Sequence, residues 1–148
     1  MTTINSKALL SDDSFKAPVE TNDCVIYAIA TAFDLDYDSA HKEVSNRMNR
    51  KPLSGVRRSD IIKALAEGTT INTKTVTEVI KSPQKMYKVY GNFIPRKNRL
   101  STFVKQNGQG TFLLILRGHA ITLKEGVIMN NKRETKPGVI VEVAFRIE

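Results

Sequence analysis

Cys24 is the residue from which a chemical interpretation of this sequence starts. It is the only cysteine of the chain, and it stands where polar residues give way to the apolar run from Val25 to Phe33. Asn22 or Asp23 can act as the N-cap, because a short side-chain oxygen accepts the unpaired amides of a first helical turn. Cys24 then lies in that turn, where the helix dipole favours the nucleophilic thiolate. The sequence therefore predicts a reactive cysteine at a helix N-terminus.

The small number of sulfur and imidazole groups restricts the remaining chemistry. A single cysteine forms no intrachain disulfide, and one cysteine with two histidines argues against a structural zinc site. We therefore expect neither a metal ion nor an organic cofactor.

Length and composition predict one folded domain. The 148 residues are 41% hydrophobic and 26% charged, as in an ordinary globular protein. The apolar runs are shorter than the roughly 20 residues that span a bilayer, and no apolar signal-peptide core follows Met1. We expect a cytoplasmic protein without a membrane partner, with a flexible arm over residues 1–17 and a single domain over residues 18–148.

The strong positive charge suggests an anionic partner. The formal net charge is +8 and the pI is about 9.7, which favours nucleic acid or an acidic protein. The most basic stretches are short: Arg57-Arg58, Arg96 to Arg99, and Lys132-Arg133. Such runs are usually solvated, and a nucleic-acid site would need them on one face near Tyr87, Tyr90 or Phe93. No nucleic-acid motif accompanies them, so the charge predicts non-specific contact at most.

Three helices are expected before the first clear strand. They run from Cys24 to about Phe33, from a cap at Asp38 or Ser39 to about Arg50, and from a cap at Ser59 to Ala66. The first is apolar nearly all round, which indicates a buried central helix. Residues 69–82 suit either a half-buried strand or an extended linker, and residues 86–94 either another strand or irregular packing that Pro95 ends.

The C-terminal third predicts an antiparallel sheet. Thr111 to Leu116 is a continuous apolar run, typical of a central strand that is covered on both faces. A β-hairpin should follow over residues 119–130, with its turn at Lys124-Glu125-Gly126, and a last strand over residues 139–147. The expected fold class is α+β, with the helix headed by Cys24 packed on a sheet of about four to five strands.

Two segments carry a resemblance to a known family. A Cys-headed helix followed by a sheet with a strand starting at Gly118-His119 resembles the papain-like cysteine peptidases. More narrowly, "NDCVIYAIATAFDLDYDSAHKEV" and "GTFLLILRGHAITLKEGVIMNN" are similar to small papain-like-fold bacteriophage proteins with a "DCVVRAIA … HAVAVKDGVVYD" pattern. The resemblance covers residues 20–68 and 100–131. It implies a papain-like fold, a phage origin and therefore a place in the host-cell cytoplasm.

The resemblance also implies roles for individual residues. Cys24 matches the nucleophile, and His119 matches the general base that takes its proton. Asn130 stands where the family has the aspartate that orients the imidazole. A two-residue hairpin loop places Asn130 on the face of His119, whereas a three-residue loop sets Asn131 opposite His119. We favour Asn130.

The oxyanion hole departs from the family pattern. Besides the Cys24 amide, papain-like enzymes often use a Gln about six residues before the cysteine, where this chain has Pro18, which donates no hydrogen bond. Asn22 is the better substitute donor and Thr21 the weaker one. Tyr27 also replaces an arginine of the family motif.

Two functions from different classes follow from these residues. The first is a thiol hydrolase that cuts a peptide, isopeptide or other amide bond in a peptide or protein substrate. The second is a non-catalytic protein of the same fold that docks on a host protein or on nucleic acid, which Pro18 favours. A hydrolase requires Cys24 and His119 to meet in one site.

Overall fold

The computed structural model describes residues 23–51, 55–81, 86–89, 92–95, 99–129, 135–136 and 138–148. Its helices are α1 (Cys24–Ala32), α2 (Tyr37–Arg47), α3 (Arg58–Ala64) and α4 (Leu100–Gln106). Its strands are β1 (Thr70–Ile71), β2 (Lys74–Lys81), β3 (Met86–Val89), β4 (Asn92–Pro95), β5 (Thr111–Leu116), β6 (His119–Lys124), β7 (Val127–Met129) and β8 (Val141–Ile147). Within the described residues, three helices precede the first strand, as predicted. The predicted arm over residues 1–17 lies outside the described residues.

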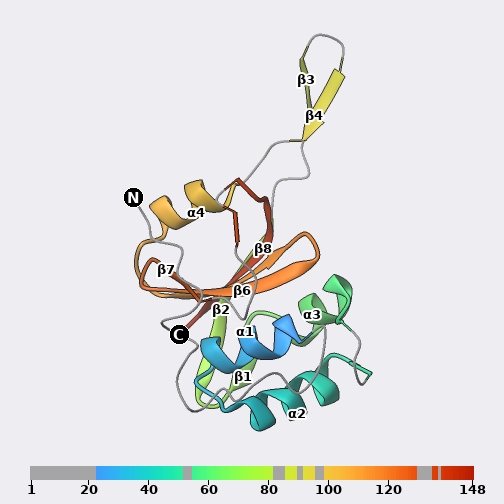
Figure 1. Ribbon diagram of the computed structural model, residues 1–148, viewed down its shortest axis with the longest axis vertical. Coiled ribbons are helices and arrows are strands. Elements are labelled where there is room, and N and C mark those ends of the chain that lie inside the picture. The colour runs from blue at the N-terminus through green and yellow to red at the C-terminus, as the bar shows by residue number, and fades with distance from the viewer. Residues whose placement is uncertain are drawn as a thin grey trace.

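One antiparallel sheet organises the fold. Six strands pair in the order β1-β2-β8-β5-β6-β7 (Figure 1). The strand β5 lies between β8 and β6, and every residue after Thr111 in it is buried. This confirms the prediction of a central strand at Thr111–Leu116, because a strand that is covered on both faces carries apolar side chains in both directions.

The sheet has more strands than the four to five expected, because residues 69–82 form two of them. Asn72 and Thr73 make the turn between β1 and β2, with φ angles of 50° and 65°. The Asn72 side chain donates hydrogen bonds to the carbonyls of Phe33 (2.8 Å) and Asp34 (3.1 Å), which anchors the turn to the end of α1. Glycine is the usual sequence signal of a hairpin turn with positive φ. This turn contains no glycine, so the sequence did not identify it.

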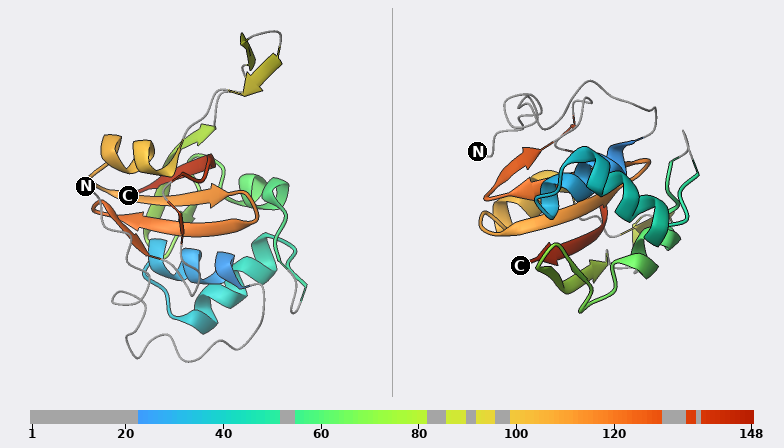
Figure 2. Two further views of the ribbon diagram at one scale, coloured as in Figure 1. Left: turned by 45° about the horizontal axis from the view of Figure 1, so that its top comes forward. Right: turned by 90° about the horizontal axis from the view of Figure 1, so that it is seen from below.

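Helices cover both faces of the sheet. Figure 2 shows α1 and α2 on one side and α4 on the other. Along β5 the side chains alternate between the two sides, so that Leu113 and Ile115 join the core under α1 while Phe112, Leu114 and Leu116 join the core under α4. The predicted α+β class, helices packed on an antiparallel sheet, is confirmed at this level.

The central helix α1 is fixed to the strand β6 at two points. Its residues from Val25 to Ala32 are all buried, as predicted. The Thr122 hydroxyl of β6 donates a buried hydrogen bond of 2.7 Å to the Ala28 carbonyl. Just beyond the helix, Asp34 accepts a hydrogen bond of 2.8 Å from Lys124 at the end of β6. These contacts align the helix that begins with Cys24 against the strand that begins with His119.

The two remaining strands, β3 and β4, form a separate hairpin. The strands β3 and β4 pair with each other and stand apart from the large sheet (Figure 1). Of the two alternatives for residues 86–94, strand structure is the one found, and Pro95 ends β4 as predicted. Among the described residues, no helix is long and apolar enough to cross a membrane.

Candidate functional site

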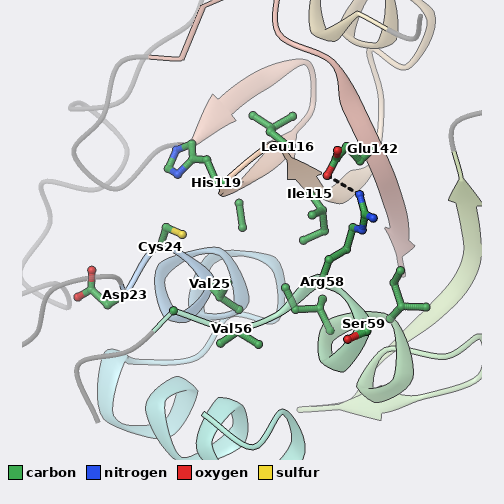
Figure 3. Close-up of a pocket in the computed structure, with 15 residues that line it drawn as sticks. Asp23, Cys24, Val25, Val56, Arg58, Ser59, Ile115, Leu116, His119 and Glu142 are labelled. Carbon is green, nitrogen blue, oxygen red and sulfur yellow. Dashed lines mark ion pairs between the residues drawn. The ribbon is translucent and has the colours of Figure 1, made fainter. Parts of the chain in front are cut away.

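A pocket of about 790 Å³ opens where the N-terminus of α1 meets α3 and one end of the large sheet. Three strands contribute at that end, namely the last residues of β5 and the first residues of β6 and β8. Both Cys24 and His119 line the pocket, on the same side of it and from different elements (Figure 3). The structure therefore brings together the two residues that the sequence singled out for thiol chemistry.

Cys24 is the first residue of α1 and is partly exposed to the pocket. Asp23 occupies the N-cap position, but its side chain makes no capping hydrogen bond. Asp23 is only 6% exposed, and its carboxylate instead accepts a hydrogen bond of 2.9 Å from the Tyr37 hydroxyl of α2. Of the two predicted N-cap residues, Asp23 holds the position but its side chain does not cap the helix; its carboxylate instead binds the Tyr37 hydroxyl, which connects the start of α1 to α2.

Tyr27 lies one helical turn after Asp23 and belongs to the same buried cluster. Burial, and then the negative charge of Asp23, raise the pKa of the Tyr27 hydroxyl above its usual value. Its ring meets the Tyr37 ring edge-on at 5.4 Å between centroids. Tyr27, at the position where the pattern that this segment resembles has an arginine, is therefore a neutral core residue three positions after the cysteine.

His119 opens β6 directly after the turn Arg117-Gly118, in which Gly118 takes a positive φ of 70°. Alternation along β6 assigns His119 to the face of Ile121, which packs in the core under α4. His119 nevertheless lines the pocket, because it is the first residue of β6 and lies at the end of the sheet where the pocket opens. The side chain is 9% exposed.

The hairpin after His119 has the register on which the choice of Asn130 depends. Lys124 pairs with Val127, so the loop consists of two residues, Glu125 and Gly126, with positive φ angles of 49° and 78°. This confirms the turn and the two-residue loop that the sequence favoured. Asn130 itself lies outside the described residues.

Other predicted site residues also lie outside the described part of the chain. They are the proposed oxyanion donor Asn22, its weaker alternative Thr21, the departure at Pro18, and Asn131. Their roles stay predictions.

An ion pair on the opposite side of the pocket was missed by sequence reasoning. Arg58, the first residue of α3, contacts Glu142 of β8 at 2.8 Å (Figure 3). Glu142 is the extra residue of a β-bulge, since Ile115 pairs with Val143 and Leu116 with Val141. Bulges redirect a side chain and are common beside functional sites.

The Arg57-Arg58 cluster is exposed to solvent, as predicted for such a run, and both guanidinium groups also form ion pairs. Arg58 contacts Glu142, and Arg57 contacts Asp60 of its own helix at 3.0 Å. The i, i+3 spacing of Arg57 and Asp60 is a usable local signal. Nothing local identifies Glu142, which comes from the last strand.

The pocket wall is polar and apolar in about equal parts. Its aliphatic lining residues are Val25, Val56, Ile61, Ile62, Ile115, Leu116 and Ala120. A cavity of this size lies within the range of sites that hold small molecules or peptide segments. In the described part of the chain, no group of three or more histidine, cysteine or acidic side chains is arranged to hold a metal ion.

Comparisons with models of known protein families, with curated proteins and with solved structures found no match to this chain. The papain-like resemblance therefore stays a prediction from the two quoted segments, and function has to be inferred from the pocket.

Proposed function

We propose that this chain is a thiol hydrolase of papain-like arrangement and phage origin that cuts an amide bond in a peptide or protein. One observation carries the proposal: Cys24 and His119, far apart in the sequence, line the same pocket. A thiol nucleophile and an imidazole base in one partly apolar cavity are the two groups that nucleophilic acyl transfer by a cysteine requires. The pocket volume of about 790 Å³ is sufficient for a peptide side chain and the scissile bond.

The reaction would proceed through a thioester. The Cys24 sulfur attacks the amide carbonyl carbon while His119 accepts the thiol proton. The C–N bond then breaks, and the imidazolium of His119 gives its proton to the departing amine. Water, deprotonated by His119, hydrolyses the thioester, which releases the acid and restores the thiol.

Two supporting roles belong to the same proposal. The Cys24 amide and Asn22 would donate hydrogen bonds to the oxyanion, and Asn130 would orient the imidazole. The buried bond from Tyr37 to Asp23 supports the first role, because it fixes the position of the helix start that carries the Cys24 amide.

The test uses the two histidines of the chain as a matched pair. Full-length wild type, His119→Ala and His41→Ala are treated with a peptidyl electrophile that mimics an acyl group, and the Cys24 adduct is followed by mass spectrometry. His41 lies on α2 and does not line the pocket, so its removal should leave the labelling rate unchanged. Loss of a positioned general base should lower the rate by roughly 10²- to 10⁴-fold in His119→Ala. Equal, slow labelling of all three proteins would contradict the hydrolase.

The rival function is a non-catalytic protein of the same fold that docks on a host protein or on nucleic acid. Pro18 favours it, because proline has no donor to offer at the position of the family's glutamine. If the chain only binds, neither wild type nor Cys24→Ser turns over an amide substrate, and both bind the partner equally well. A hydrolase loses turnover in Cys24→Ser while it retains substrate binding.

A further inference from the structure

The wall of the pocket that faces the thiol carries an ion pair. Figure 3 shows Cys24 and His119 on one side of the pocket and Arg58 with Glu142 on the other. The Nη1 atom of Arg58 lies 2.8 Å from Oε1 of Glu142, and both residues line the pocket. Among the described lining residues, Arg58 is the only lysine or arginine. A ligand that extends from Cys24 across the pocket therefore reaches a permanent cation.

This ion pair contributes little to the support of the fold. The Arg58 side chain is 56% exposed and the Glu142 side chain 29% exposed, and ion pairs that water reaches contribute little to stability. The helix α3 is instead held by apolar side chains, because Ile61 and Leu65 are buried in the core under α1. The pair is therefore better explained by what it offers to a ligand in the pocket.

Glu142 leaves part of the Arg58 guanidinium available to a ligand. A guanidinium has five N–H donors in a planar fork, and a bidentate carboxylate occupies two of them. Arg58 can therefore bind a second carboxylate while it keeps its contact with Glu142. The contact also restricts the arginine side chain, so less rotamer entropy is lost when a ligand binds.

The surroundings of the pocket favour an anion over a cation. The two acidic lining residues already have partners, Asp23 in the Tyr37 hydroxyl and Glu142 in its ion pair. Two exposed arginines, Arg57 and Arg117, stand next to lining residues in the sequence. The net charge of +8 also raises the concentration of anions near the surface.

We propose that Arg58 is a specificity-determining residue that binds an acidic side chain of the substrate, so that the pocket selects peptides with Asp or Glu near the scissile bond. The inference rests on the proposed hydrolase, since the peptide in the pocket has to reach Cys24. A compact cavity of about 790 Å³ is roughly 9 Å across, and an extended peptide advances about 3.3 Å per residue. We therefore expect the acidic residue within about three positions of the scissile bond.

The first experiment digests a mixed peptide library with full-length wild type and with Cys24→Ser, and mass spectrometry identifies the cleavage sites. Asp and Glu should be enriched at one position within about three residues of the sites whose cleavage requires Cys24. Amidation of the peptide C-termini should leave this enrichment unchanged. Cleavage without enrichment, or only near free C-termini, would overturn the inference and leave the hydrolase standing.

Absence of Cys24-dependent cleavage would instead contradict the hydrolase, and binding alone then tests the carboxylate site. The library is passed over immobilised Cys24→Ser, and the retained peptides are identified. They should be enriched in Asp and Glu, and a second substitution, Arg58→Gln, should abolish this enrichment. Retained peptides without the enrichment, or no retained peptides, would overturn the inference.

The two adjacent arginines provide matched variants. The best library peptide is compared with a copy that has Asn or Gln at the acidic position. Wild type should prefer the acid by about 10-fold in kcat/KM, the lower end of the range for a charged hydrogen bond. Arg58→Gln should lose this preference mainly through KM, because the contact exists in the ground state and in the transition state alike. Arg57→Gln should keep the preference, since Arg57 pairs with Asp60 and is not among the described lining residues.

A third variant, Glu142→Gln, separates substrate binding from a merely structural role. It breaks the ion pair as Arg58→Gln does, so a structural pair predicts the same kinetic change in both variants. If Arg58 binds the substrate, Glu142→Gln removes the nearest competing negative charge, and the preference for the acid should rise about threefold. Equal loss of the preference in the Arg58 and Glu142 variants, or in the Arg58 and Arg57 variants, would overturn the inference.

Discussion

Thr122 offers the sharpest test of how α1 is held against β6. Its hydroxyl donates a hydrogen bond of 2.7 Å to the Ala28 carbonyl, and Thr122 is fully buried. The Ala28 carbonyl lies inside a helix, where it also accepts the amide four residues later. Thr122→Val therefore removes one hydrogen bond without leaving a buried group wholly unsatisfied.

Three substitutions of Thr122 separate the contribution of the hydrogen bond to stability from the contribution of the buried methyl group. A buried neutral hydrogen bond contributes about 1 kcal/mol to the free energy of unfolding, and a buried methyl group contributes about 0.8 kcal/mol plus a small cavity term. Thr122→Val should therefore cost about 1 kcal/mol and Thr122→Ser about 1 kcal/mol. Thr122→Ala loses both groups and should cost about 2 kcal/mol.

Urea unfolding at pH 7 measures these differences, with thermal unfolding as a second readout in which 1 kcal/mol corresponds to about 3 °C for a chain of this size. The m-value should stay constant across the series. A Thr122→Val variant as stable as wild type, together with a Thr122→Ala variant no worse than Thr122→Ser, would show that the hydroxyl contributes nothing. That result would refute the anchoring of α1 to β6 by this bond.

Three further predictions concern the surroundings of the site. Tyr37→Phe deprives the buried Asp23 carboxylate of its donor and should lower the free energy of unfolding by about 1.5–3 kcal/mol in urea; a change below about 0.5 kcal/mol would contradict this role. The hydrogen bond from the β6 lysine is the main cause that lowers the pKa of Asp34 below its usual 3.8, so wild type should lose stability as pH falls below about 4, by less than about 1 kcal/mol for this exposed pair. Asp34→Asn should lack that component in pH-dependent thermal unfolding, and an identical acid profile would speak against it. Glu125 has a φ of 49° before Gly126, so Glu125→Asn should stabilise the turn by up to about 1 kcal/mol in thermal unfolding; a lower melting temperature would count against the turn geometry.

Local patterns predicted most of the secondary structure. The apolar run from Val25 became α1, and the run at Thr111–Leu116 became the central strand. Gly126 marked the hairpin turn, because glycine tolerates the positive φ that a two-residue loop requires. The turn at Asn72-Thr73 escaped prediction because threonine rarely adopts a positive φ, and a side-chain contact with the end of α1 holds it there.

The candidate site was predicted only in part. Cys24 was identified by its place at the start of an apolar helix, and His119 by its place in a segment that resembles a known pattern. Neither observation predicts that the two residues line one pocket. The Asp23 carboxylate accepts a hydrogen bond from Tyr37, a residue of another helix, and does not cap α1. Arg58 forms an ion pair with Glu142 at a bulge in the last strand.

The sequence by itself predicted most of the helices and the strands of the C-terminal third, and it shows that the chain has one cysteine and a net charge of +8. These properties depend on near neighbours, whose spacing sets periodicity, turn geometry and charge density. Only the tertiary structure decided that Cys24 and His119 share a pocket, and that an Arg58–Glu142 pair closes its far side. The order of strands in the sheet and the bulge in β8 bring these residues together, and both arise from contacts between distant segments that no local pattern encodes.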